Sequence, residues 1–527
     1  MGKYFNPSNQ SFTDDSTAPI YVDKTGLLEH LNRCIRTPNR CVAVSHARRF
    51  GKSQAAGMLD AYYSKGCNSH ELFSRFEIAK TADFEKYLNK YNVIHIDMAQ
   101  MCDNCNGDFM EKLFKTLTAE FAASELGDKL DCSKPVELVI SDIYTLTDLP
   151  FVIIIDEWDC VVRNYASDQR LVHEYMQFLH ALFKSELAKQ FLALGYITGI
   201  LPIKKFDDES TLNNFREYTM INSRGLTKYF GFTENEVEEL CIKYNADIVG
   251  VKEWYDGYDI NGISMYNPNS VCQAMEFHEL TSYWTNTSSF STINRFVTLN
   301  FEGLKDDVIN MLKGERVAVN VRTFRNDLSE INSKDDALTA LIHLGYLAYD
   351  TEMEEAYIPN FEVALAYHSA LPSSGWKDVA DSISRCTDLL NATIRKDEEK
   401  VAELIDKAHT AYTSHIKYND ENSLSCVVSM AYFTAPAYYT IVREFASGRG
   451  FADLAFIPKK MSSNRPPMII ELKWNKSADS AIKQVKEKRY HGALSGFCNE
   501  ILLVGINYDK DDKDKKHTCK IERVRNV

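Results

Sequence analysis

Short apolar runs alternate with amphipathic segments over the first 230 residues. Apolar positions three and four residues apart predict helices over 20–32, behind an acidic cap, and over 53–65. Buried strands are predicted for the branched-residue runs 40–45 (RCVAVS), 91–99 (YNVIHIDMA) and 151–159 (FVIIIDEWD), and for the end of 190–200 (QFLALGYITGI). Strands that alternate with helices indicate an α/β fold with a parallel sheet and helices on both faces.

The pattern changes after residue 230. A capped helix is predicted over 231–244, and a turn that leads into a helix at 266–271. Asp256-Gly257, within WYDGYDI, predicts a tight hairpin turn whose aromatic flanks pack together, although direct contact with a ligand is the alternative. From 290 to about 400 the pattern is mainly helical with short strands, which predicts a helical connector, of which a winged helix is one form.

The last block begins near residue 400. A helical pattern covers 423–445, and a second helix is predicted over 477–494. Strands are predicted at 450–457 (GFADLAFI), 466–474 (PPMIIELKW), 501–508 (ILLVGINY) and 517–524 (HTCKIERV). Three domains are therefore expected: 1–230, a P-loop-type α/β domain; 231–400, a helical lid or connector; and 401–527, a second α/β domain.

Composition limits the class of protein. The 527 residues carry a net charge of −14, which argues against a surface that coats nucleic acid non-specifically, although it leaves room for a local basic groove. The first residues are polar, no apolar run approaches the length of a membrane helix, and the 13 cysteines form no regular framework. We expect free thiols, a cytoplasmic location and no membrane association.

The segment RRFGKS lies between a predicted strand and a predicted helix. Gly51 allows close backbone approach to a phosphate, Lys52 reaches the β- and γ-phosphates, and the Ser53 hydroxyl binds Mg²⁺. The usual first glycine of such a loop is replaced by His46, which either contacts phosphate or occupies a simple loop position. Arg48 and Arg49 contact phosphate or a neighbouring subunit's nucleotide, or are solvated loop charges.

A second signal follows the run FVIII. Asp156 at the strand end is placed to hold Mg²⁺, and Glu157 to orient and activate the attacking water. Thr198 ends the next strand, where a polar side chain would touch the γ-phosphate or the water. Either motif alone is often structural; together, in this order, they predict a nucleotide site.

A different chemistry is predicted near the C-terminus. Glu471 and Lys473 are two residues apart on one predicted strand, so their side chains share a face, and Asp453 on the preceding run approaches them if the two runs form a hairpin. Two carboxylates with a lysine form a minimal Mg²⁺-dependent phosphodiesterase site. A salt-bridged sheet is the alternative. Gln484 and Lys488 lie one turn apart on the next predicted helix, beside a stripe of apolar residues that is expected to pack against the sheet. Tyr490 lies at the end of this stretch.

These motifs resemble two known families. YVDKT, RRFGKS, IIIDEWD, TGI, TLNNF, WYDGY, YNPNS and YWTNTS are similar to the AAA-ATPase-like family of bacterial proteins, with Ala47 where its members usually have proline. The D…ExK…Q…Y pattern resembles the PD-(D/E)XK nuclease superfamily. The resemblance implies ATP as nucleotide, a prokaryotic source and a further acidic residue on an earlier helix, for which Glu421 fits best and Glu444 is weaker.

The function expected is ATP binding and hydrolysis coupled to a Mg²⁺-dependent nuclease-like domain that acts on DNA or RNA, in defence or mobile-element control. The alternative is an ATP-gated regulator whose nuclease fold binds nucleic acid or protein without cleavage. A homo-oligomer with an arginine supplied in trans is also implied, with Arg163 and Arg216 as candidates. Cys102 and Cys105 have C-x-x-C spacing but lack two further zinc ligands in a matching motif, so we interpret them as incidental thiols.

Overall fold

The computed structural model describes the chain except residues 1, 104–108, 204–211, 285–288, 300, 313, 325–330, 371–376, 413–420, 433, 436–437, 448–449, 459–464, 489–499, 511–515 and 526–527. It forms two compact units. The first comprises Met1–Ala246, Tyr255–His278 and Asn300–Val363, and the second Asp247–Trp254, Glu279–Leu299 and Ala364–Val527. None of the described helices is both long and apolar enough to cross a membrane.

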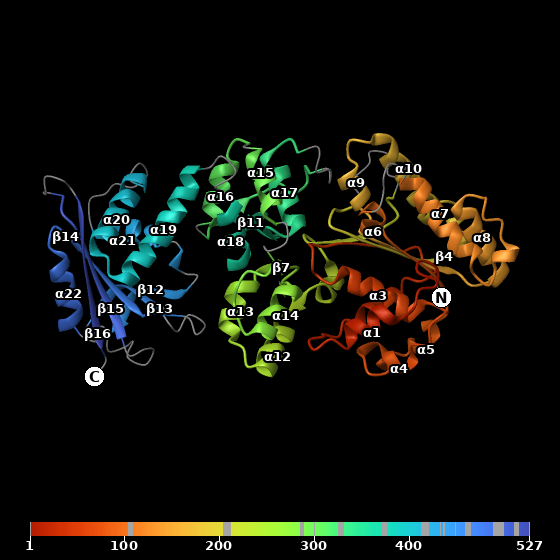
Figure 1. Ribbon diagram of the computed structural model, residues 1–527, viewed down its shortest axis with the longest axis horizontal. Helices are drawn as coiled ribbons and strands as arrows, with labels where there is room; N and C mark the ends of the chain where they lie inside the picture. The colour runs from red at the N-terminus through yellow and green to blue at the C-terminus, as the bar shows by residue number, and fades with distance from the viewer. Residues whose placement is uncertain are drawn as a thin grey trace. The chain divides into compact units, whose positions relative to one another are not determined.

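The first unit is built on a parallel sheet, as the sequence predicts (Figure 1). Its order is β2-β3-β4-β1-β5, with bounds β1 Cys41–Ser45, β2 Asn92–Asp97, β3 Phe151–Asp156, β4 Leu192–Gly199 and β5 Arg216–Thr219. All four neighbouring pairs are parallel. The carboxyl ends of β1, β2, β3 and β4 therefore meet at one edge of the sheet.

Alternate strand residues face two different helical layers. On one face, Val42, Val44 and Ile154 pack with α2 (Gly26–Asn32) and α3 (Lys52–Tyr63). On the other face, Ala43, Ile153 and Ile155 pack with α7 (Phe109–Ala122), α8 (Val136–Thr147) and α10 (Gln169–Phe183). Shorter helices complete these layers: α1 Gln10–Ser16, α4 His70–Phe73, α5 Phe84–Tyr87, α6 Met98–Asp103, α9 Cys160–Asn164 and α11 Ala188–Phe191.

A small antiparallel sheet follows, with order β6-β8-β7 (Phe232–Thr233, Ile263–Tyr266 and Tyr258–Ile260). The predicted hairpin exists, but its turn is wrongly placed in the sequence prediction. The turn that joins β7 to β8 is Asn261-Gly262, whose φ values of 56° and 75° suit the mirror-image turn of a two-residue hairpin. Asp256-Gly257 precedes β7, and Gly257 is required there because a Cβ would lie 1.8 Å from the Pro359 carbonyl oxygen.

The helices around this sheet begin as predicted. α12 (Glu234–Tyr244) starts at a capping box between Thr233 and Glu236, and α14 (Pro268–Phe277) starts at Asn267, whose side chain accepts two backbone N–H groups. A second antiparallel sheet has the order β10-β11-β9 (Ala348–Asp350, Glu355–Tyr357 and Val317–Ala318). The remaining helices of this stretch are α13 Ile248–Tyr255, α15 Ser289–Thr298, α16 Leu304–Leu312, α17 Lys334–Leu344 and α18 Phe361–Ala370.

The second unit contains a five-stranded mixed sheet, β12-β13-β14-β15-β16, in which only β14 and β15 are parallel. The bounds are β12 Tyr439–Ser447, β13 Gly450–Pro458, β14 Met468–Trp474, β15 Glu500–Tyr508 and β16 His517–Arg525. One face packs on α19 (Lys377–Arg395), α20 (Glu398–Tyr412) and α21 (Glu421–Ala431), and the other on α22 (Ala478–Glu487) (Figure 1).

The helix predicted over 423–445 is confirmed in its first part and wrong in its last part. The helix α21 ends at Ala431, and residues from Tyr439 onward form the edge strand β12. Pro436 has no backbone N–H to continue a helix, and the run 439–442 (YTIV) consists of residues that favour strands. The helical spacing of apolar residues continued by chance into the strand.

Candidate functional sites

The loop between β1 and α3 has the features of a phosphate cradle. Gly51 is the N-cap of α3 with a φ of 86°, a left-handed conformation that favours glycine. Lys52 is buried, and its Nζ donates hydrogen bonds of 2.9 Å to the backbone oxygens of His46 and Ala47. The lysine therefore lies over its own loop, at the N-terminus of a twelve-residue helix.

The other loop residues differ in exposure. Ser53 and Arg48 are exposed, and Arg49 is half-buried with a φ of 67°. His46 is fully buried; its Nε2 lies 2.6 Å from the Ser223 hydroxyl. Burial, with Lys52 nearby, lowers the pKa of His46 to about 3, so the ring is neutral. His46 is therefore a buried packing residue of the loop, which corresponds to the simple loop position of the two predicted alternatives.

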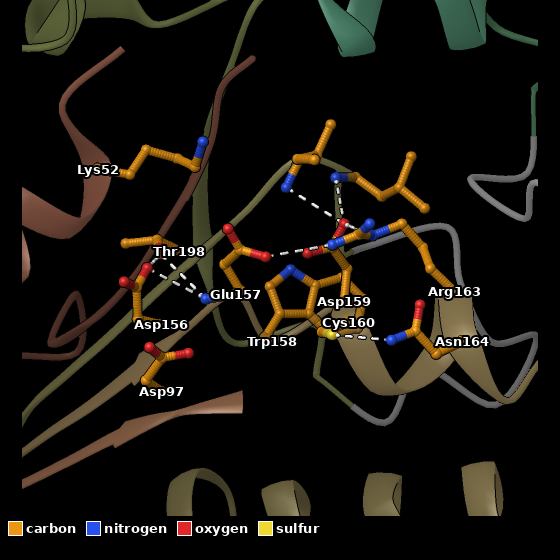
Figure 2. Close-up of polar contacts among 12 residues, drawn as sticks. Lys52, Asp97, Asp156, Glu157, Trp158, Asp159, Cys160, Arg163, Asn164 and Thr198 are labelled. Atoms are coloured by element: carbon orange, nitrogen blue, oxygen red, sulfur yellow. Dashed lines mark hydrogen bonds and ion pairs between the residues drawn. The ribbon is translucent and has the colours of Figure 1, made fainter. Parts of the chain in front are cut away.

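Asp156 and Thr198 meet at the carboxyl ends of β3 and β4. Both are buried, and the Thr198 hydroxyl donates to Asp156 Oδ1. The backbone N–H of Glu157 is directed at the same two side chains, at 3.1 Å from Asp156 Oδ1 and 3.3 Å from Thr198 Oγ1. Sequence reasoning grouped these three residues with Lys52, and the structure brings all four to one edge of the sheet (Figure 2).

The charges at this edge act on one another. Burial lowers the pKa of Lys52, and the nearby carboxylates of Glu157 and Asp156 oppose that effect. Burial raises the pKa of Glu157, and Lys52 followed by Arg163 opposes it. Glu157 has a φ of 50°, which is uncommon for a residue with a side chain and turns the chain sharply after β3.

The two candidate arginine fingers lie at different places in their own chain, and a role of either in trans stays a prediction. Arg163 is only 13% exposed and is held by ion pairs to Asp159 and Glu157 of its own chain. Arg216 is exposed at the start of β5, and because β5 is parallel to β1 it lies at the edge of the sheet opposite the loop that carries Lys52.

An aromatic contact packs the loop between β1 and α3 against the hairpin β7–β8. Phe50 packs edge-on against Tyr258, with ring centroids 5.3 Å apart, in a buried cluster with Ala47, Met265 and Ala348. The Tyr258 hydroxyl donates to the Gly345 carbonyl at 2.7 Å. The second tyrosine of WYDGY is thus a packing residue, as the sequence interpretation favoured.

In the second unit, Asp453, Glu471 and Lys473 come together. The strands β13 and β14 pair only from Leu454 to Phe456, and beyond this point the Asp453 carboxylate accepts the Leu472 N–H at 2.7 Å. Glu471 and Lys473 are both buried, and Lys473 Nζ donates to Glu471 Oε1 and to the Leu472 carbonyl, each at 2.9 Å. The carboxylates therefore gather where the two strands separate.

The helix α22 adds Gln484, as predicted. Its amide donates to Glu471 Oε1, and the predicted stripe Ala478, Ala481, Ile482 and Val485 is buried against the sheet. Burial and the Asp453 charge raise the pKa of Glu471, while Lys473 opposes them. Glu471 Oε2 has no hydrogen-bond partner among the described residues.

Two family models match different parts of the chain. Residues 10–207 match the family model described as a predicted AAA-ATPase, and residues 419–518 match the model of the PD-(D/E)XK nuclease superfamily. The chain carries an AAA-ATPase-like domain and a PD-(D/E)XK nuclease-like domain.

Individual relatives are distant. An uncharacterized protein in the vnfD 5' region of Azotobacter chroococcum mcd 1 is 23% identical over 276 residues, which span 51% of each chain. The Aeropyrum pernix ORC2 protein is 10% identical with a TM-score of 0.35 over 71% of this chain and 100% of that one. Saccharomyces cerevisiae Hsp104 is 12% identical with a TM-score of 0.29 over 81% of this chain and 54% of that one. These TM-scores are too low to define the fold of this chain.

Both domains present oxygen donors of the kind that Mg²⁺ prefers. In the ATPase-like domain these are Asp156 and the Ser53 hydroxyl, and in the nuclease-like domain Asp453 and Glu471, whose Oε2 lacks a partner in the described chain. Within the same described residues, no three His, Cys, Asp or Glu side chains form a ready-made metal cluster. The residues fit a metal shared with phosphate oxygens and water better than a cage made by protein alone.

The other residues named from the sequence differ in where they lie. Glu444 is exposed on the strand β12, whereas the family pattern would place the extra acid on a helix. Glu421 begins α21, but its side chain lies outside the described residues, as do Tyr490 and Cys105. Lys488 caps the end of α22 and acts electrostatically on Glu471.

Three residues of these sites were missed. Asp97 ends β2 in register with Asp156, and Figure 2 shows the two side chains next to each other. Asp159 is fully buried and binds Arg163. Gly505 lies opposite Glu471 in β15, where a Cβ would approach the Ala478 carbonyl oxygen to 2.4 Å. An acidic residue at the end of another predicted strand was the available signal for Asp97.

Proposed function

We propose that the AAA-ATPase-like domain binds ATP with Mg²⁺ and hydrolyses it. The observation that carries this proposal is the convergence of Lys52, Asp156, Glu157 and Thr198, from three separate elements, at one edge of the sheet. A lysine at a helix N-terminus supplies the positive charge that the β- and γ-phosphates need. Ser53 and Asp156 would hold the metal, and bound Mg²⁺ would neutralise charge on the phosphates.

In this proposal Glu157 orients the attacking water and Thr198 contacts the water or the γ-phosphate. The contacts of Thr198 with Asp156 and with the Glu157 backbone support these roles, because they fix the Asp156 carboxylate relative to the backbone of Glu157. Lys52 would leave the carbonyl groups of His46 and Ala47 and donate to phosphate oxygens instead. Arg48 and Arg49, which belong to the same loop, would add positive charge.

We also propose that the PD-(D/E)XK nuclease-like domain cleaves phosphodiester bonds in DNA or RNA. Asp453 and Glu471 would hold Mg²⁺, which lowers the pKa of a bound water. Lys473 orients that water or stabilises the developing charge, and Gln484 fixes the orientation of Glu471. The partnerless Glu471 Oε2 in a buried position supports the metal assignment, because buried carboxylate oxygens ordinarily have partners.

The two activities suggest a nucleotide-driven switch that controls a nuclease, in defence or mobile-element control in the bacterial cytoplasm. The proposed division of the chain is an ATPase domain (1–230), a lid or connector (231–400) and a nuclease domain (401–527). Several copies of the whole chain would assemble as a homo-oligomer. The alternative is an ATP-gated regulator that binds nucleic acid without cutting it. The engagement of Lys473 with Glu471 and the Leu472 carbonyl is compatible with that alternative.

The ATPase proposal is tested with the full chain. The parent protein should release phosphate from ATP in Mg²⁺. E157Q should keep nucleotide affinity and lose about 100-fold or more in kcat, whereas K52A should lose nucleotide binding itself. An inactive parent protein that also fails to bind ATP would refute the proposal.

The nuclease proposal is tested with labelled DNA and RNA in Mg²⁺. Cleavage that disappears in D453A and K473A supports it, and E399A at the exposed start of α20 is the matched control that should cleave normally. Binding without cleavage in the parent protein, with a steep salt dependence, would establish the alternative.

A further inference from the structure

Arg163 is unusually well anchored for a charged residue on a five-residue helix. Its Nε donates to Asp159 Oδ2 at 2.9 Å, and a terminal nitrogen lies 3.4 Å from Glu157 Oε2. Its side chain is 13% exposed, and that of Asp159 is fully buried. A planar guanidinium can engage two carboxylates at once in a fixed geometry, whereas a lysine ammonium cannot reproduce that arrangement.

Asp159 connects this pair to the end of β4. Its Oδ2 also accepts the backbone N–H groups of Ile200 at 3.3 Å and Leu201 at 3.1 Å, which directly follow Thr198 and Gly199. Gly199 is part of the same fit, because a Cβ there would lie 2.7 Å from the Trp158 ring and 2.8 Å from Asp159 Oδ1. The turn after β3 and the end of β4 are therefore interlocked around one buried carboxylate.

Among the described residues, the Glu157 carboxylate is bound through one of its two oxygens. Figure 2 shows one of its carboxylate oxygens joined to Arg163 and the other directed away from the arginine. The left-handed φ of 50° limits the positions that the side chain can take. A carboxylate fixed through one oxygen has the second oxygen available to accept a hydrogen bond from a water.

We propose that Arg163 is a positioning residue for ATP hydrolysis: it holds the Glu157 carboxylate in place through one oxygen, and Asp159 sets Arg163 against the end of β4. This inference rests on the ATPase function proposed above. It assigns Arg163 a role within its own chain, in contrast to a finger supplied in trans. Asp159 contributes by keeping the guanidinium in place and by linking it to the strand that carries Thr198.

The expected kinetic signature follows from this geometry. Arg163 does not contact the phosphate loop, so R163M should leave the KM for ATP within about threefold of the parent value. The water would be oriented less well, so kcat should fall about 10- to 100-fold. R163K keeps a positive charge near Asp159 but cannot bind Asp159 and Glu157 at once as the planar guanidinium does. Its kcat should therefore lie between those of R163M and the parent protein.

The decisive measurement is a double-mutant cycle in steady-state ATP hydrolysis with the full chain. If Arg163 acts through Glu157, R163M should lower kcat strongly in the parent background and hardly at all in E157Q. R170M is the matched control, because Arg170 pairs with Glu174 on an exposed helix face and is 88% exposed. It should leave kcat unchanged in both backgrounds.

The outcomes separate this inference from the function beneath it. A parent protein without ATPase activity overturns the proposed function and this inference with it. An active parent protein in which E157Q is inactive but R163M and R163K are normal overturns the positioning role alone. Equal losses for R163M in both backgrounds, or a loss confined to nucleotide affinity, also overturn it. If R163M unfolds, as thermal melting would reveal, R163K and D159N provide the same cycle.

Discussion

The close packing of α22 against β15 makes Gly505 the most informative position in the nuclease-like domain. An added Cβ would lie 2.4 Å from the Ala478 carbonyl oxygen, 3.0 Å from the Ala481 Cβ and 3.2 Å from an Ile482 carbon. The nearest atom belongs to the backbone and cannot rotate away. Since carbon–oxygen contacts are about 3.3–3.6 Å, G505A must move the start of α22 by roughly 1 Å.

Two effects of that displacement can be estimated. Overfilling a packed core costs about 1–3 kcal/mol, which corresponds to a roughly 5- to 150-fold larger equilibrium constant for local opening of α22. The same shift moves Gln484 away from Glu471, which lies opposite Gly505 on the neighbouring strand. A displacement of about 1 Å in a catalytic group can cost up to 100-fold in rate.

Hydrogen–deuterium exchange of the full chain measures the first effect. Peptides from Ala478–Glu487 should exchange faster in G505A, while peptides from the ATPase-like domain keep their parent rates. Any Mg²⁺-dependent cleavage should fall with the loss of protection, and ATP hydrolysis should not change. Unaltered protection of α22 would refute the close-packing argument.

G225A is the matched control for this experiment. Gly225 lies in the short helix η3 (Arg224–Tyr229), and a Cβ there meets no described atom within 4 Å. The same chemical change in open space should therefore leave exchange and melting unaltered. A similar loss of α22 protection in G225A would show that the effect does not come from the clash.

Two further predictions concern the ATPase-like domain. F50A removes a buried ring that packs on Tyr258 next to the phosphate loop. It should therefore destabilise this domain by about 3–5 kcal/mol, as measured by thermal melting, and weaken ATP binding, as measured by titration calorimetry. ATP binding equal to that of the parent protein would contradict this prediction. His95 on β2 lies 2.6 Å from Asp60, and although burial lowers its pKa, Asp60, Asp156 and Asp97 raise it to about 8. Because the folded pKa exceeds the ordinary value of 6.5, this pair contributes about 2 kcal/mol that is fully present below pH 6.5 and is lost as the pH rises through 8. Melting temperatures of H95Q should therefore lack that fall between pH 6.5 and 8.5, and a parallel pH dependence in both proteins would exclude this origin.

Local spacing was sufficient for much of the fold. Four of the five strands of the parallel sheet (β1 to β4), the start of α3 directly after Gly51 and the shared face of Glu471 and Lys473 follow from patterns within a few residues, and the structure has them close to where they were predicted. Such features depend on backbone propensity and side-chain period, which neighbouring residues already determine. The same reasoning failed where local signals were ambiguous, as at the boundary between α21 and β12 and at the turn of the β7–β8 hairpin.

Tertiary structure decided how the chemical groups are supported. The contacts of Phe50 with Tyr258, of Asp159 with the residues after β4, and of Glu471 with Gln484 beside Gly505 join positions far apart in the sequence or on different elements. No periodicity encodes such pairs, because they arise only when separate elements pack together and buried polar groups must find partners. The sequence alone therefore identified most of the candidate catalytic and binding residues, and the packing of the folded chain determined which residues hold them in place.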